Sequence, residues 1–223
     1  MMRLVTRQQW GARPPRSIVP LPGSAIDTTV FHYSGADADE QADHANCAGR
    51  VRGIQRFHMD TRGWLDIAYS FLVCIHGYVF AARGYGVRTA ATGRANGHSL
   101  AVCFLGNDSA GRADVTPAAR QAHVEIARAI NVRYGRVMRY AGHRDFMATA
   151  CPGDELYRYI RSPEFARASA PSDPSKELRW LLPWLHWKLG GEEGPRPRGT
   201  PRRIPEGAWA VADAINAGEF ERR

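Results

Sequence analysis

Lysine is nearly absent from this chain: only Lys176 and Lys188 occur among its 30 lysine and arginine residues. The arginine excess gives a formal net charge of +8, which would attract a polyanion such as nucleic acid or an anionic cell envelope. The C-terminal basic segments RPRGTPRR and RRIPEG are short and broken by proline, unlike a helix that reads nucleic acid. We therefore expect no nucleic-acid partner, and a GC-rich genome explains the arginine bias.

Long apolar runs are also missing. No run approaches the roughly 18 residues of a membrane span, so we expect no transmembrane segment. The N-terminal stretch MMRLVTRQQWGARPPR lacks the apolar core of a signal peptide, and we expect any export to be indirect. The four cysteines have no paired spacing and are expected to be reduced: Cys47, Cys74, Cys103 and Cys151. Cys74 and Cys103 lie in apolar runs and are predicted to be small buried hydrophobes.

Four segments have the β-branched, apolar composition of buried strands: 26–35, 67–83, 98–107 and 136–143. The first should end at His32 or just past it, the second should contain two strands that meet at His76-Gly77, and the last should end at His143.

Three segments are predicted to be helices: 44–60, 116–135 and 151–160. The second has an N-cap in Thr116, proline at the first helical position and Gly135 as its stop. Because strands and helices alternate, we predict an α/β fold with a mixed central β-sheet flanked by helices.

The stretch GHRDFMATACPG, residues 142–153, combines a histidine with a cysteine. His143 is predicted at a strand end, and Cys151 at a helix N-terminus, which would lower the pKa of its thiol. Imidazole and thiolate are good zinc ligands. His32 is the best third ligand, because active groups of α/β sheets gather at strand ends. Two histidines and one cysteine leave a fourth position to water, as in a catalytic zinc site.

Five blocks strengthen this interpretation by their order along the chain: VTRQQWGARPP, FHYSG, VRGIQRFHMDTRGWLDIAYSFLV, SLAVCFLGN and GHRDFMATACPG. With them, nearly all of residues 4–160 resembles a type 2 N-acetylmuramoyl-L-alanine amidase, the fold shared by peptidoglycan recognition proteins and amidase-type phage endolysins. The resemblance is greatest to the endolysins. It implies Zn2+ ligands at His32, His143 and Cys151, a tyrosine near the zinc at Tyr69, and a further site residue at Thr149.

The implied reaction is hydrolysis of the amide between the muramic acid lactyl group and the first L-alanine of the stem peptide. Zinc would lower the pKa of its water towards roughly 7 and polarise the carbonyl. Tyr69 would hold or deprotonate the water or donate to the oxyanion, and Thr149 would add a hydrogen bond there. A surface tyrosine with no role in catalysis is the alternative for Tyr69.

Substrate contacts are implied around ARGYG. The motif Arg83-Gly84-Tyr85 resembles the Arg-Gly-Trp form associated with diaminopimelate-type walls, with tyrosine in place of tryptophan. Arg88 and Arg94 would clamp stem carboxylates, unless they are ordinary solvated arginines. Many relatives have a histidine where this chain has Ala91, so one contact is missing or moved. Relatives also carry paired cysteines near Cys47, of which only one is evident.

Composition changes after the predicted catalytic domain, residues 1–168. Residues 169–223 are predicted to form a linker and a Trp/Pro/Arg-rich helical C-terminal extension, with tryptophans at Trp180, Trp184 and Trp187. These aromatics either pack on the amidase or bind the cell wall or a partner.

The sequence thus predicts a zinc-dependent, monomeric peptidoglycan amidase. We expect a phage endolysin that stays in the host cytoplasm until a membrane lesion releases it to the wall. A cytoplasmic amidase that recycles muropeptides, a non-catalytic peptidoglycan-binding module and a nucleic-acid-binding protein are the alternatives.

Overall fold

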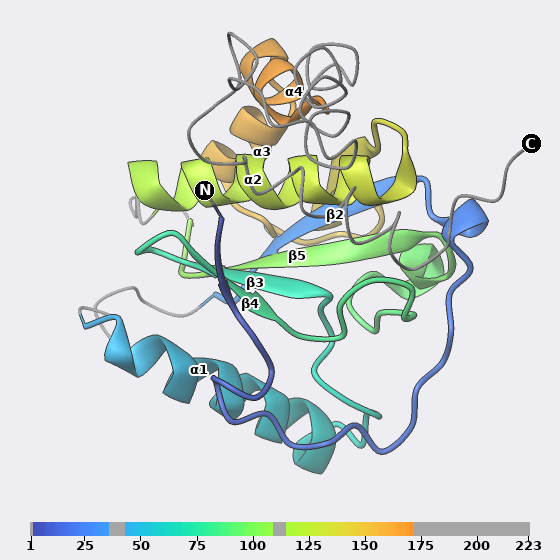
Figure 1. The fold of residues 1–223 in the computed structure, drawn as a ribbon, viewed down its shortest axis with the longest axis vertical. Helices are drawn as coiled ribbons and strands as arrows, with labels where there is room; N and C mark the ends of the chain where they lie inside the picture. Colours follow the sequence, from blue (N-terminus) through green and yellow to red (C-terminus); the bar gives the residue numbers. More distant parts are fainter. Residues whose placement is uncertain (1, 36–42, 109–114, 172–223) are drawn as a thin grey trace, which may run out of the picture. The chain divides into compact units, whose positions relative to one another are not determined.

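A mixed sheet of six strands forms the centre of the fold (Figure 1). The computed structural model describes residues 2–35, 43–108 and 115–171, so the predicted C-terminal extension and its tryptophans lie almost entirely outside the described residues. The strands are β1 (Arg3–Val5), β2 (Thr28–Tyr33), β3 (Phe71–Cys74), β4 (Tyr78–Ala81), β5 (Ser99–Leu105) and β6 (Arg139–Gly142). Their order is β1-β4-β3-β5-β2-β6. The β3–β4 hairpin is antiparallel and the other pairs are parallel, which confirms the predicted mixed sheet.

Helices cover both faces of the sheet (Figure 1). Helix α1 (Ala45–Arg56), continued by the π-helical turn η3 (Phe57–Thr61), lies on one face, and α2 (Pro117–Tyr134) lies on the other. Two short helices, α3 (Asp154–Ile160) and α4 (Pro163–Ser169), follow β6, and α4 packs on α2. None of the helices in the described ranges combines the length and apolar character that a membrane crossing requires.

The pleat of β2 decides which side chains reach which layer. Successive side chains of a strand point to opposite faces of the sheet. Phe31 belongs to the apolar core on the α2 side, so His32 lies on the α1 side. His32 is in register with Cys103 of β5, and Cys103 is in register with Leu72 of β3. Cys103 and Leu72 both belong to the α1-side core.

Helix boundaries test the local sequence signals. Helix α2 is confirmed: the Thr116 side chain accepts a hydrogen bond from the Ala119 N–H, and Gly135 ends the helix with φ of 63°. The helix predicted to open at Pro152 is wrong, because α3 begins only at Asp154. Gly153 has φ of 90° and ψ of 167°, far from helical values, so Cys151 and Pro152 form a turn before the helix.

Candidate metal centre and neighbouring pocket

Three of the predicted site residues meet at one edge of the sheet. His32 lies near the end of β2, His143 directly follows β6, and Cys151 lies in the turn before α3. Because β2 and β6 pair in parallel, their carboxyl ends lie at the same edge. One ligand atom from each of the three residues lies within 4.8 Å of the others.

The two ring nitrogens of His32 have different partners. Nδ1 is 3.8 Å from Cys151 Sγ, and Nε2 is 3.1 Å from Thr92 Oγ1. A metal-binding histidine usually donates its second ring N–H to a fixed acceptor, and Thr92 can accept it here. Asn96 holds Thr92 in place, since its Oδ1 accepts the Thr92 N–H at 2.8 Å. Thr92 is not predictable from the sequence, because one threonine in an irregular loop carries no signal.

His143 supplies an independent indication of a metal. Its Nε2 is buried and has no hydrogen-bond partner among the described residues. The rings of His32 and His143 lie 4.6 Å apart. Burial lowers the pKa of both imidazoles, so both are neutral at pH 7 and keep a lone pair for a cation. The donor set of two neutral imidazoles and one thiol therefore fits Zn2+.

Backbone contacts hold the Cys151 sulfur in this group. The Tyr33 N–H donates to Sγ at 3.3 Å, and the Cys151 N–H donates to Thr149 Oγ1 at 3.2 Å. The expected lowering of the thiol pKa by a helix N-terminus is wrong: α3 starts three residues later, and burial raises the pKa of Cys151 to about 12. A cation at this site would have to displace the thiol proton.

Asp108 fixes the turn that presents Cys151. Its Oδ2 accepts the Leu156 N–H in the first turn of α3 at 2.7 Å, which replaces the missing capping side chain of Gly153. A Cβ at Gly153 would lie 2.4 Å from the Cβ of Asp108, so the two segments touch only because residue 153 is glycine.

Tyr69 lies beside the candidate metal ligands, with its ring centroid 5.5 Å from that of His32. Burial raises the pKa of the phenol well above its ordinary value of 10. The phenol is therefore protonated at neutral pH and is a hydrogen-bond donor rather than a base. Cys103 is fully buried, as predicted.

A pocket of about 290 Å³ is linked to this centre through intervening residues. Its lining consists of Val19, Gly63, Trp64, Leu65, Arg83, Arg88, Thr89 and Ala90. Two chains of contacts connect it to the ligands. Thr89 Oγ1 hydrogen-bonds Asn96 Oδ1, which also accepts from Thr92. On the other side His58 stacks on Trp64 and contacts the Tyr69 ring, at centroid distances of 4.8 and 5.8 Å.

The residues predicted to bind substrate have different surroundings. Arg83 and Arg88 line the pocket, but Arg83 already donates to the carbonyls of Ile67, Arg88 and Asp66. Tyr85 packs against Phe71 at 4.9 Å, and burial raises its pKa to about 12. Of the Arg83-Gly84-Tyr85 motif, only Arg83 lines the pocket, whereas Tyr85 packs on the α2-side core. Arg94 is exposed in η4 (Gly93–Gly97), two residues after Thr92.

Comparison with known proteins identifies the fold and the family. A family described as N-acetylmuramoyl-L-alanine amidase matches residues 22–154. Human N-acetylmuramoyl-L-alanine amidase is 36% identical over 169 residues, which are 74% of this chain but 29% of that protein. The chain thus spans less than a third of this relative. Peptidoglycan-recognition protein SC2 of Drosophila simulans is 30% identical over 162 residues, 71% of this chain and 85% of that protein.

Solved structures point to the same family as the sequence relatives. Peptidoglycan recognition protein-LE in complex with tracheal cytotoxin, a monomeric diaminopimelic acid-type peptidoglycan, has a TM-score of 0.64 and 29% identity, covering 73% of this chain and 95% of that one. The fold is therefore that of the peptidoglycan recognition proteins, as predicted. Because the family match extends over more than half of the sequence, this chain belongs to the N-acetylmuramoyl-L-alanine amidase family, together with the peptidoglycan-recognition proteins.

Proposed function

We propose that the chain is a zinc-dependent amidase that cleaves the bond between N-acetylmuramic acid and the L-alanine of the stem peptide. One observation carries the proposal: a buried His143 Nε2 without a partner among the described residues lies beside His32 and Cys151 at the sheet edge. A silent recognition module would not need this complete ligand set, which matches that of a catalytic zinc site with one position left open.

The roles of the protein groups follow from their positions. His32, His143 and Cys151 would hold the ion, which when bound supplies Lewis-acid polarisation of a carbonyl and lowers the pKa of water. Tyr69, as a protonated phenol beside His32, would donate a hydrogen bond to the oxyanion that develops on the scissile carbonyl. Thr149, exposed and anchored to the Cys151 N–H, would add a second donor at the same edge.

The pocket lined by Trp64, Arg83 and Arg88 is the candidate site for the stem peptide. The relative bound to a diaminopimelic acid-type fragment supports this substrate class. Arg88 is exposed on the pocket rim and would form a bidentate pair with a stem carboxylate, and Arg94 would do so nearer the metal. Arg83 would act by shaping the pocket wall, and Gly84 and Tyr85 would act only by holding Arg83 in place.

For the biological role, we propose a monomeric phage endolysin that accumulates in the host cytoplasm and reaches the wall through a membrane lesion. An amidase of muropeptide recycling would use the same chemistry on soluble fragments. A binding module without turnover is the other candidate, because several relatives are named as recognition proteins.

The test measures hydrolysis of a soluble muramoyl tripeptide and of intact diaminopimelate-type walls by the full chain. We expect release of the free peptide, loss of activity with a chelator, recovery with added Zn2+, and no activity in Cys151→Ser. Faster turnover of walls than of fragments supports the endolysin, and the reverse order supports recycling. Zinc-loaded protein that binds fragments without releasing peptide would refute the enzyme and establish the binding module.

A further inference from the structure

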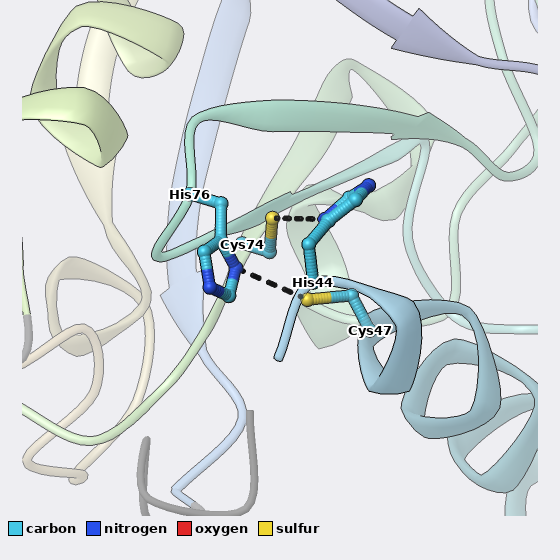
Figure 2. A group of neighbouring side chains, drawn as sticks. All are labelled: His44, Cys47, Cys74 and His76. Carbon is cyan, nitrogen blue, oxygen red and sulfur yellow. Dashed lines mark hydrogen bonds between the residues drawn. The ribbon is translucent and has the colours of Figure 1, made fainter. Parts of the chain in front are cut away.

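A second group of side chains that could bind a metal lies apart from the centre at His32. Figure 2 shows this second group. It consists of His44, Cys47, Cys74 and His76. His44 and Cys47 lie one turn apart at the start of α1, where the Cys47 N–H donates to the His44 carbonyl. Cys74 ends β3, and His76 lies in the turn that leads to β4. The start of α1 and the end of β3 with its following turn thus each contribute one histidine and one cysteine.

The spacing of the four ligand atoms suits one tetrahedral ion. Cys47 Sγ lies 3.5 Å from His76 Nδ1, Cys74 Sγ lies 3.8 Å from His44 Nδ1, and all four atoms lie within 4.8 Å of one another. Tetrahedral zinc, with bonds of about 2.3 Å to sulfur and about 2.0 Å to nitrogen, separates its ligand atoms by roughly 3.3–3.8 Å. Small side-chain adjustments would therefore complete the coordination.

The sulfurs of this group differ from ordinary core cysteines. Both side chains are fully buried and reduced, and each lies against a histidine of the opposite element. The prediction that Cys74 is only a small hydrophobe is therefore incomplete, because its apolar run conceals a polar neighbourhood.

Neighbouring groups hold both histidines. The His44 ring stacks on Tyr78 with a centroid distance of 3.7 Å and an interplanar angle of 18°. Arg3 packs over the same Tyr78 ring and donates to the His76 carbonyl. In the same turn Gly77 has φ of 75°, and a Cβ there would lie 2.7 Å from the Ala118 carbonyl oxygen. The turn that presents Cys74 and His76 is thus fixed before any ion binds.

We propose that His44, Cys47, Cys74 and His76 form a second, structural zinc site that joins the start of α1 to the β3–β4 turn. Four protein ligands leave no position for water, which is the pattern of a structural rather than a catalytic zinc. Cys74 lies two strands and two residues from the register position of His32, roughly 12 Å by strand spacing and rise. The sites are separate, and this inference does not depend on the amidase activity.

Metal content of the full chain, purified with reductant, tests the proposal. We expect two zinc ions per chain in the wild type, and one each in Cys74→Ser, His44→Ala and Cys151→Ser. Cys103→Ala is the matched control, since this buried cysteine belongs to neither ligand group, and it should keep both ions. The Cys74→Ser protein should also melt at a lower temperature than the wild type and should keep the zinc at His32.

Cobalt substitution of the intact wild type gives a readout that does not require a mutant to fold. Absorption from cobalt–thiolate bonds should report three such bonds, and Cys151→Ser should retain about two thirds of it because a site with two thiolates remains. One metal per wild-type chain that disappears in Cys151→Ser would overturn the proposal. A Cys47–Cys74 disulfide in a protein with one zinc would also overturn it.

Discussion

Gly153→Ala should damage the metal centre without touching a ligand. Residue 153 lies two positions after Cys151, and its φ of 90° with ψ of 167° falls in a region that only glycine adopts readily. A Cβ would also lie 2.4 Å from the Asp108 Cβ and carbonyl oxygen and 2.5 Å from its Oδ2. These contacts involve backbone, so rotation of one flexible side chain cannot relieve them.

The magnitude follows from two separate costs. Backbone strain of this kind costs about 1–3 kcal/mol, and overpacking costs about 1–3 kcal/mol more. If Asp108 moves away, the hydrogen bond that caps the Leu156 N–H is lost as well. We expect a loss of about 4 kcal/mol, which for a chain of this size lowers the melting temperature by about 8–16 °C.

The assay is thermal unfolding of zinc-loaded protein together with a zinc competition titration. Gly53→Ala is the matched control: Gly53 lies inside α1, and a Cβ added to it would meet nothing within 4 Å, so alanine there should be neutral or stabilising. A Gly153→Ala protein with wild-type melting temperature and zinc affinity would refute the argument that this glycine positions Cys151.

Three further outcomes test individual groups. Thr92→Val should weaken zinc binding about 10- to 100-fold in a chelator competition, because His32 loses the partner of its Nε2, and unchanged affinity would contradict this role. Tyr69→Phe should keep zinc but lose about 10²-fold in hydrolysis rate, whereas Tyr159→Phe, packed on Phe165, should not. Burial holds the pKa of His123 at about 4, below its ordinary 6.5, so the unfolded chain binds more protons between these values and stability falls as pH drops from 6.5 to 4. His123→Leu should remove about 3 kcal/mol of this dependence in denaturant titrations, and parallel pH profiles of the two proteins would disprove it.

Local signals in the sequence predicted much of the fold. The cap at Thr116 and the stop at Gly135 located α2, and the apolar composition of 98–107 located β5. The start of α3 was misplaced, because proline after Cys151 favours a helix start while Gly153 adopts backbone angles that no sequence pattern specifies.

The candidate site was only partly predictable for a related reason. His32 and His143 follow from strand ends, which local composition marks. Thr92 depends on which loop folds against His32, and this is a property of the tertiary structure. The second group was hidden because its two pairs, His44 with Cys47 and Cys74 with His76, stand far apart in the sequence and only the α1–hairpin packing joins them.

The parallel pairing of β2 with β6 also sets an order of assembly. Cys151 contacts His32 across 119 residues of sequence, whereas Cys74 contacts His44 across 30. Closing the longer loop costs about 1 kcal/mol more in chain entropy, and it also requires the last strand of the sheet to be in place. During synthesis the α1–hairpin group can therefore close while the His143 segment is still emerging. His32, His143 and Cys151 meet last, so the centre proposed for hydrolysis forms only when the whole sheet is complete.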